Sequence, residues 1–157
     1  MRVVKAPEER RKEILETAMR LFTENGYEAT SMRDIAKEMG VVQGLCYRYF
    51  DSKQALFEEA METYVRECCA GFLQILHNPS KSLREKLDAF FDALKQEGET
   101  LKYHGFFHQA ENKELHELLS LKFCKYMRPH LLKELQRGSE HGDLRLKSPE
   151  ILVDFII

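Results

Sequence analysis

The sequence lacks several features that would mark other classes of protein. No apolar run approaches the ~20 residues that a membrane-spanning helix needs, and residues 1–5 hold no signal-peptide core. The four cysteines lack the spacing of zinc ligands, so reduced and mostly buried thiols are expected, with a redox switch as the alternative. No nucleophile motif, phosphate-binding loop or pair of carboxylates indicates catalysis. These absences predict a cytoplasmic protein that is not an enzyme, does not enter the membrane and carries no cofactor.

The charge of the chain is nearly balanced, which limits the partners it can have. A formal net charge of −2 at pH 7 argues against a protein that coats nucleic acid regardless of sequence. Residues 1–12 nevertheless hold five cationic side chains against two glutamates. Such an arm can reach DNA phosphates or an adjacent minor groove, and a frayed, solvated terminus is the alternative. Charged residues at 32% and hydrophobic residues at 43% indicate a globular chain.

Residues 30–56 have the pattern of two short helices joined by a tight turn, with a third helix following at once. Ser31 and Asp34 have the spacing of a capping box, in which side chain and backbone satisfy each other at a helix start. Gly40 is expected to end this helix, because the residue just past a helix end often adopts the left-handed conformation that glycine tolerates. The next helix is expected from residue 42 or 43 to Tyr49. This arrangement is a helix-turn-helix, whose second helix can lie in the DNA major groove.

These residues also carry a resemblance to a known family, over roughly residues 8–60. The matching residues are Asn25-Gly26-Tyr27, residues 30–36, Gly40-Val41, Gly44, Tyr47, Tyr49-Phe50 and Ser52-Lys53. In them the chain resembles the tetracycline-repressor-like (TetR) family of bacterial transcriptional regulators. The resemblance implies an all-α fold, with a three-helix helix-turn-helix DNA-binding head at 1–53 and a helical ligand-binding and dimerisation body at 54–157. It also implies that part of the dimerisation surface is missing from this sequence.

The resemblance places one face of the second helix against DNA. Gln43 has the chemistry for a bidentate contact with adenine and Arg48 for one with guanine, each worth about 1–3 kcal/mol of discrimination. Gly44 lets the backbone approach the duplex closely. Tyrosine hydroxyls suit phosphate oxygens, and Lys53 lies at a helix start that already favours an anion. The implied DNA-binding residues are Arg33, Val42, Gln43, Gly44, Leu45, Tyr47, Arg48, Tyr49 and Lys53.

Two of these positions depart from the family pattern. Val42 stands where a small polar N-cap is usual, which is expected to cost the helix about 1 kcal/mol unless a DNA phosphate binds the free amides. Leu45 stands where a small or hydroxylated residue is usual, and it either contacts a thymine methyl group or covers the tyrosines. The operator sequence therefore cannot be transferred from a relative.

Apolar residues elsewhere recur at helical spacing and predict further helices. The predicted ranges are 7 or 8 to 24, 52–77, from 82 onward, 104–110 and 112–137. Pro129 is expected to kink or break the last of these, because proline removes a backbone hydrogen bond. A loop is expected at 138–145, and Ser148-Pro149 is typical of a helix start.

The aromatic side chains of the body have two interpretations, a packed core or a pocket for a small, largely apolar effector. The candidate pocket residues are Phe107, His108, Phe123 and Tyr126. His104 and His108 are four residues apart, with Glu111 and His116 beyond, and helical spacing could bring two imidazoles to one metal ion; exposed or core-edge histidines are the alternative.

Together these features predict a ligand-responsive transcription factor. We expect a repressor that binds a palindromic double-stranded DNA operator as a homodimer and is released by a small-molecule inducer. Two alternatives remain open. One is a protein–protein interaction module whose head does not read DNA, and the other is a metal-binding or small-molecule-binding protein that uses residues 104–116.

Overall fold

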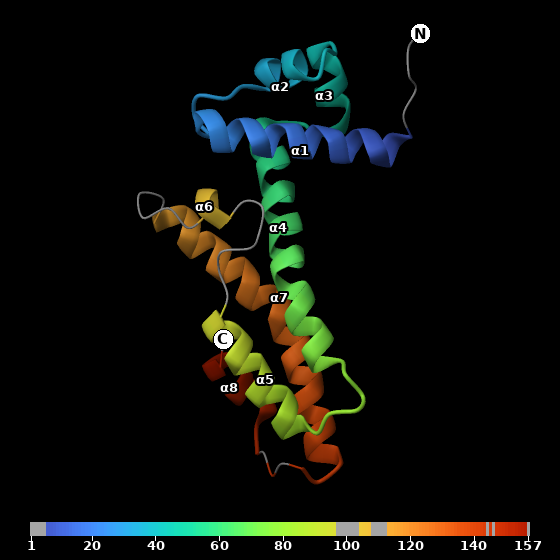
Figure 1. Ribbon diagram of the computed structural model, residues 1–157, viewed down its shortest axis with the longest axis vertical. Helices are drawn as coiled ribbons and strands as arrows, with labels where there is room; N and C mark the ends of the chain where they lie inside the picture. The colour runs from blue at the N-terminus through green and yellow to red at the C-terminus, as the bar shows by residue number, and fades with distance from the viewer. Residues whose placement is uncertain (1–5, 97–103, 108–112, 144, 146, 157) are drawn as a thin grey trace. The chain divides into compact units, whose positions relative to one another are not determined.

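The computed structural model describes residues 6–96, 104–107, 113–143, 145 and 147–156. All regular structure within these residues is helical, which confirms the predicted all-α class (Figure 1). The helices are α1 (Pro7–Asn25), α2 (Met32–Glu38), α3 (Gln43–Tyr49), α4 (Lys53–Leu76), α5 (Leu83–Gln96), α6 (His104–Phe107), α7 (Lys113–Glu140) and α8 (Pro149–Ile156).

The chain divides into two compact units, Met1–Thr63 and Tyr64–Ile157. The first unit, called the head below, holds α1, α2, α3 and the beginning of α4. The second unit, called the body, holds the rest of α4 and the helices that follow it. The beginning of α4 belongs with the head because its Phe57 ring lies edge-on to Phe22 of α1, with centroids 5.6 Å apart.

The core of the head is built on α1. Ile14, Ala18 and Phe22 recur every four residues along this helix and are fully buried, as expected for an apolar stripe at helical spacing. Helix α2 packs on α1, and α3 packs on α2. Cys46 is the buried residue of α3, and it ties that short helix to the core.

The turn between α2 and α3 is fixed by backbone hydrogen bonds. At the start of α2, Asp34 N–H donates to the Ser31 hydroxyl and the Ser31 amide donates to the Asp34 carboxylate, so the predicted capping box is confirmed. At its end, Gly40 has φ +65°. The Gly40 amide donates to Lys37 O at 3.1 Å and the Val41 amide to Ala36 O at 2.9 Å. These two bonds form a Schellman motif, which requires the left-handed residue that Gly40 supplies.

The body is organised around α7, which packs against α5, α6 and α8. Met127, Leu131 and Leu135 form its fully buried stripe. The helix continues through Pro129, so the predicted break does not occur. Burial of the same stripe on both sides of the proline explains why the helix persists.

The predicted loop at 138–145 is wrong at its beginning, because α7 continues through Gly138 to Glu140. A Cβ atom at Gly138 would lie 2.1 Å from Leu83 Cδ2, so the glycine makes room for α5 rather than ending the helix. The left-handed residue of the turn that follows Glu140 is instead Gly142, with φ +82°. The Gly142 amide donates to Ser139 O and the Asp143 amide to Gly138 O, which repeats the turn found after α2.

Across the described part of the chain, no helix combines the length and the apolar character that crossing a bilayer requires.

Candidate nucleic-acid interface

Helix α3 has one buried side and one exposed side. Cys46 is fully buried and Phe50 follows it four residues later, also buried. Gln43, Tyr47 and Arg48 are exposed on the other side. Among the described residues, Gln43 and Arg48 have no hydrogen-bond or ion-pair partner. The helix therefore presents an amide and a guanidinium whose donors are available to a molecule outside the chain.

The C-terminal end of α3 is held by Arg11 of α1. The Arg11 guanidinium donates through Nη1 to the Tyr49 carbonyl at 2.8 Å and lies 4.4 Å from the centroid of the Phe50 ring. It also donates through Nε to Glu59 of α4 at 2.7 Å, within an ion pair. The hydrogen bond that Arg11 donates to Glu59 raises the pKa of Arg11 above its ordinary value, more than burial lowers it. One side chain thus joins three helices of the head at the end of α3.

The N-terminal end of α3 lacks a side-chain cap. Val42 has extended backbone angles, φ −76° and ψ 141°, and makes no capping hydrogen bond. Its side chain is 73% exposed, which is unusual for valine. The next residue but one, Gly44, is exposed, and a Cβ atom built there would meet no heavy atom within 4 Å. The fold itself therefore requires neither residue at these positions.

Lys53, at the start of α4, contacts the loop that follows α1. Its ammonium donates to the Tyr27 carbonyl at 2.9 Å and lies 4.2 Å from the centroid of the Tyr27 ring. An ammonium has three N–H donors, so these contacts leave capacity for a phosphate oxygen. The start of α4 is capped by the Ser52 hydroxyl, which accepts from the Ala55 amide at 3.0 Å.

The remaining DNA-binding candidates lie beside this surface. Arg33 on α2 is exposed, while Leu45 and Tyr49 are half-buried. Tyr47 has 45% of its surface exposed. All nine candidates are therefore on α2, α3, the residue before α3, or the first residue of α4, within one unit of the fold.

The predicted basic arm is only partly available for DNA. Residues 1–5 lie outside the described part of the chain. Arg10 pairs with Glu13 at 2.7 Å, and Lys12 lies 3.8 Å from Glu16. Arg11 is committed to Glu59 and to the end of α3. Its role was missed from the sequence, because its partner Glu59 lies 48 residues away and no local pattern marks the pair.

The candidate effector residues of the body make ring contacts with the core. Phe107 is fully buried and stacks on Tyr64, with centroids 4.4 Å apart. Phe123 lies edge-on to Phe72 at 5.7 Å, and Tyr126 lies 5.7 Å from His130. His108 lies outside the described residues, as does much of the segment between α5 and α7.

The described residues contain no cluster of three or more His, Cys, Asp or Glu side chains that could hold a metal ion. His116 is exposed, while the side chain of His104 lies outside the described part. None of the four cysteines forms a disulfide bond, and burial raises the pKa of the Cys46 thiol.

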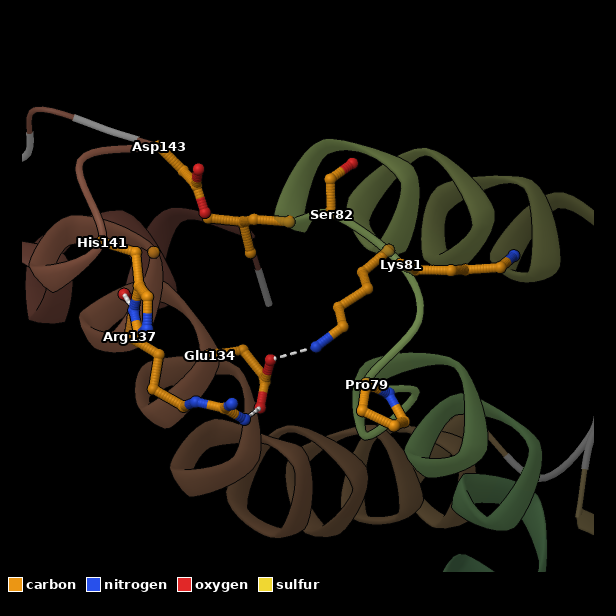
Figure 2. Close-up of a pocket in the computed structure, with 10 residues that line it drawn as sticks. Pro79, Lys81, Ser82, Glu134, Arg137, His141 and Asp143 are labelled. Carbon is orange, nitrogen blue, oxygen red and sulfur yellow. Dashed lines mark hydrogen bonds and ion pairs between the residues drawn. The ribbon is translucent and has the colours of Figure 1, made fainter.

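A polar cavity in the body was not foreseen from the sequence. It lies between α5 and the end of α7 and is lined by Lys86, Glu134 and Arg137 among others (Figure 2). A sequence signal for it was available, because the charged residues Lys86 and Glu134 lie among the buried apolar positions of α5 and α7.

Comparison with known proteins agrees with this geometry. Residues 14–60 match the family model described as bacterial regulatory proteins, tetR family. The chain is 31% identical over 154 residues to the HTH-type transcriptional repressor KstR2 of Mycolicibacterium smegmatis, covering 96% of this chain and 73% of that protein. The chain belongs to the TetR family of bacterial transcriptional regulators.

Other members of the TetR family show how far the similarity extends. IcaR of Staphylococcus aureus, a negative regulator of the biofilm operon icaADBC, is 34% identical over 83 residues, covering 52% of this chain and 41% of that protein. A TetR/AcrR-family regulator from Thermobifida fusca superposes with a TM-score of 0.61 at 25% identity, covering 92% of this chain and 78% of that one. The chain is thus a DNA-binding transcriptional regulator with the family's fold in both units.

Proposed function

We propose that this TetR-family protein is a homodimeric repressor that binds a palindromic operator and is released from it by a small, largely apolar effector. Each subunit would place α3 in the major groove, at two sites about one helical turn apart. The exposed face of α3, with Gln43 and Arg48 unpaired, is the observation that supports this most directly.

The contacts divide by chemistry into reading and positioning. Gln43 and Arg48 can donate to base edges, which discriminates between sequences. Tyr47, Arg33 and Lys53 suit phosphate oxygens, which contribute affinity that does not depend on sequence. The Schellman turn and Arg11 fix the two ends of α3, so the reading side chains are presented on a rigid helix.

Fluorescence anisotropy with labelled genomic fragments, at stated salt concentrations, tests DNA reading. Arg48→Ala should weaken specific binding by about 1–3 kcal/mol and flatten the preference at one base position. Lys53→Gln should weaken specific and nonspecific binding alike and reduce the salt slope by about one unit. Arg84→Ala, on α5, removes an arginine whose side chain is 92% exposed in the body and serves as the control.

Two results would contradict the DNA-reading proposal. Equal binding of all fragments by the unmodified protein would mean that α3 reads no sequence. Unchanged binding by Arg48→Ala and Lys53→Gln would instead favour a head that serves protein–protein contacts.

The homodimer is supported by an exposed apolar face on α8. Ile151 and Phe155 lie four residues apart and are 71% and 88% exposed. Val153 faces the other way and is fully buried, and an ion pair between Arg128 and Asp154 holds α8 on α7. Large exposed apolar side chains on one face are typical of a protein–protein interface.

Light scattering coupled to size exclusion tests the dimer. Phe155→Glu should shift the measured mass toward that of the monomer. Leu121→Glu, at an exposed leucine on α7, serves as the matched control. A monomeric unmodified protein, or a Phe155→Glu variant that stays dimeric, would show that α8 is not the interface.

The effector proposal rests on the aromatic content of the body, where Phe72 contacts both Phe90 and Phe123. A library of apolar metabolites can be screened for release of the labelled operator. A compound that releases operator must bind the DNA-free state more tightly than the DNA-bound state. If release occurs only with strongly polar compounds, the proposed class of effector is wrong.

A further inference from the structure

The body contains a polar cavity of about 220 Å³ that the DNA-binding function does not use. Its walls come from the turn between α4 and α5, the first turn of α5, the last turns of α7 and the loop that follows (Figure 2). All of these segments belong to the body.

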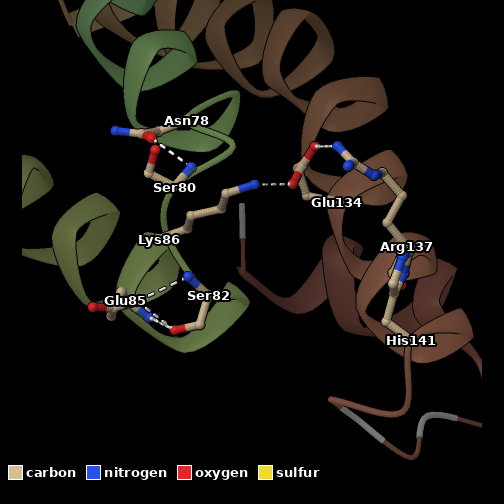
Figure 3. A network of polar contacts seen from close by, with 8 residues as sticks. All are labelled: Asn78, Ser80, Ser82, Glu85, Lys86, Glu134, Arg137 and His141. Atoms are coloured by element: carbon tan, nitrogen blue, oxygen red, sulfur yellow. Dashed lines mark hydrogen bonds and ion pairs between the residues drawn. The ribbon is translucent and has the colours of Figure 1, made fainter.

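Two of the wall residues are charged and almost completely buried. Lys86 of α5 and Glu134 of α7 have side chains only 7% and 5% exposed, and Lys86 Nζ lies 2.6 Å from Glu134 Oε2 (Figure 3). Burial would raise the pKa of Glu134, but the hydrogen bond and charge of Lys86, together with Arg137, hold it below its ordinary value. The carboxylate form of Glu134 is therefore favoured. Removing two charges from water is costly, and an apolar pair of similar volume often stabilises a fold as well or better. Stability alone does not explain the pair.

The cavity has more hydrogen-bond donors than acceptors. Glu134 uses one oxygen for Lys86 and the other for Arg137, which donates through Nη1 at 3.0 Å (Figure 3). An ammonium has three N–H donors and a guanidinium five, so both cations keep donors beyond those bonds. The lining holds three cationic side chains, including Lys81, against the carboxylates of Glu134 and Asp143. The lining thus carries a positive surplus while Glu134 has both its oxygens engaged.

The size of the cavity limits the ligand. Pockets for drug-sized ligands are typically ~300–1,000 Å³, and this cavity is smaller. A phosphate or a short carboxylate fits such a volume and supplies the acceptors that Lys86 and Arg137 lack.

We propose that this cavity is a binding site for a small oxyanion, a phosphate or carboxylate group, held by Lys86 and Arg137 between α5 and the end of α7. The lining of the cavity shares no residue with the DNA-binding candidates of the head or with the aromatic candidates for an apolar effector. The oxyanion proposal therefore does not depend on either of those proposals. Its occupant would connect the turn at Pro79 to the end of α7, since both border the cavity.

Thermal unfolding followed by circular dichroism, at constant ionic strength, tests the proposal. Inorganic phosphate and succinate are titrated separately, with chloride making up the ionic strength. We expect a saturable rise in Tm with at least one of the two anions. A response to phosphate alone assigns a phosphate group, and a response to succinate alone assigns a carboxylate.

Variants separate a site from a general salt effect. Arg137→Gln, whose side chain is 54% exposed, should weaken the response at least about tenfold in apparent affinity, because a charge-assisted hydrogen bond contributes at least that factor. Arg84→Gln on α5 removes the same charge outside the cavity and should respond like the unmodified protein.

Lys81→Gln at the rim should weaken the response less, and Lys95→Gln on α5 is its matched control. An unsaturable or equal response in chloride would overturn the proposal. So would an Arg137→Gln variant that is folded and binds the anion as tightly as Arg84→Gln.

Discussion

Replacing Gly44 by alanine should make the head more stable and make it bind DNA less well. Glycine inside a helix costs roughly 0.5–1 kcal/mol relative to alanine. The added Cβ would meet no heavy atom within 4 Å, and the backbone of Gly44 does not have the positive φ that alanine resists. The methyl group therefore has room inside the free protein, and a gain of up to this amount is expected, because Gly44 lies in the first turn of α3 rather than in a helix interior. At roughly 2–4 °C per kcal/mol for a chain of this size, Tm should rise by a few degrees.

DNA binding should change in the opposite direction. If Gly44 faces the duplex, the methyl group occupies space that the backbone and the nearby Gln43 need for close approach. Loss of one good base contact corresponds to about 1–3 kcal/mol, or roughly 5- to 150-fold in Kd. Gly71→Ala in α4 is the matched control, because its Cβ also meets nothing within 4 Å. It should give the same gain in stability with unchanged operator binding.

The assay is paired thermal unfolding and operator anisotropy on both variants at one salt concentration. A Gly44→Ala variant that binds operator like the unmodified protein would refute close approach at this residue. A lower Tm for Gly44→Ala, but not for Gly71→Ala, would show that the space around α3 is smaller than the structure indicates.

Four further predictions concern stability and can be measured by urea denaturation. Glu134→Gln should destabilise the body by about 3–5 kcal/mol because Lys86 would stay buried without its counter-charge, while Lys86→Met with Glu134→Leu should cost much less; a similar loss in both would contradict this. Because the pKa of Glu134 is lowered in the folded protein, the stability that Glu134 contributes should be fully present above its unfolded pKa of about 4.3. This stability should be lost as the pH falls through the folded pKa. The double variant should show no such loss. Gly138→Ala should destabilise by about 1–3 kcal/mol through overpacking against Leu83, with Gly71→Ala as the control, and a neutral result would mean that Leu83 moves aside freely. Val42→Ser should stabilise the head by about 1 kcal/mol by supplying the missing cap of α3, which an unchanged urea midpoint would disprove.

The parts of the fold that could be predicted from the sequence depend on signals a few residues apart. The Ser31–Asp34 box and Gly40 each act within one helical turn, and the structure contains the corresponding cap and turn. The role proposed for α3 comes from the family resemblance, because its glycines and aromatics occur at fixed positions in a long window.

The parts that could not be predicted depend on residues distant in the sequence. Arg11 and Glu59 are separated by 48 residues, as are Lys86 and Glu134. Gly138 resembled a loop residue, but its conformation depends on whether Leu83 packs against it. Nothing near it in the sequence specifies that contact, so only the folded arrangement distinguishes a helix-ending glycine from one that admits a neighbouring side chain.

The guanidinium of Arg11 has a mechanical consequence for the head. Because it hydrogen-bonds the last carbonyl of α3 and a carboxylate of α4 at once, the side chain couples the first turns of α4 to α3. A displacement of one of these helices that preserves both contacts also displaces the other. A movement of the beginning of α4 that preserves both contacts would therefore reorient α3 and its exposed side chains, Gln43 and Arg48.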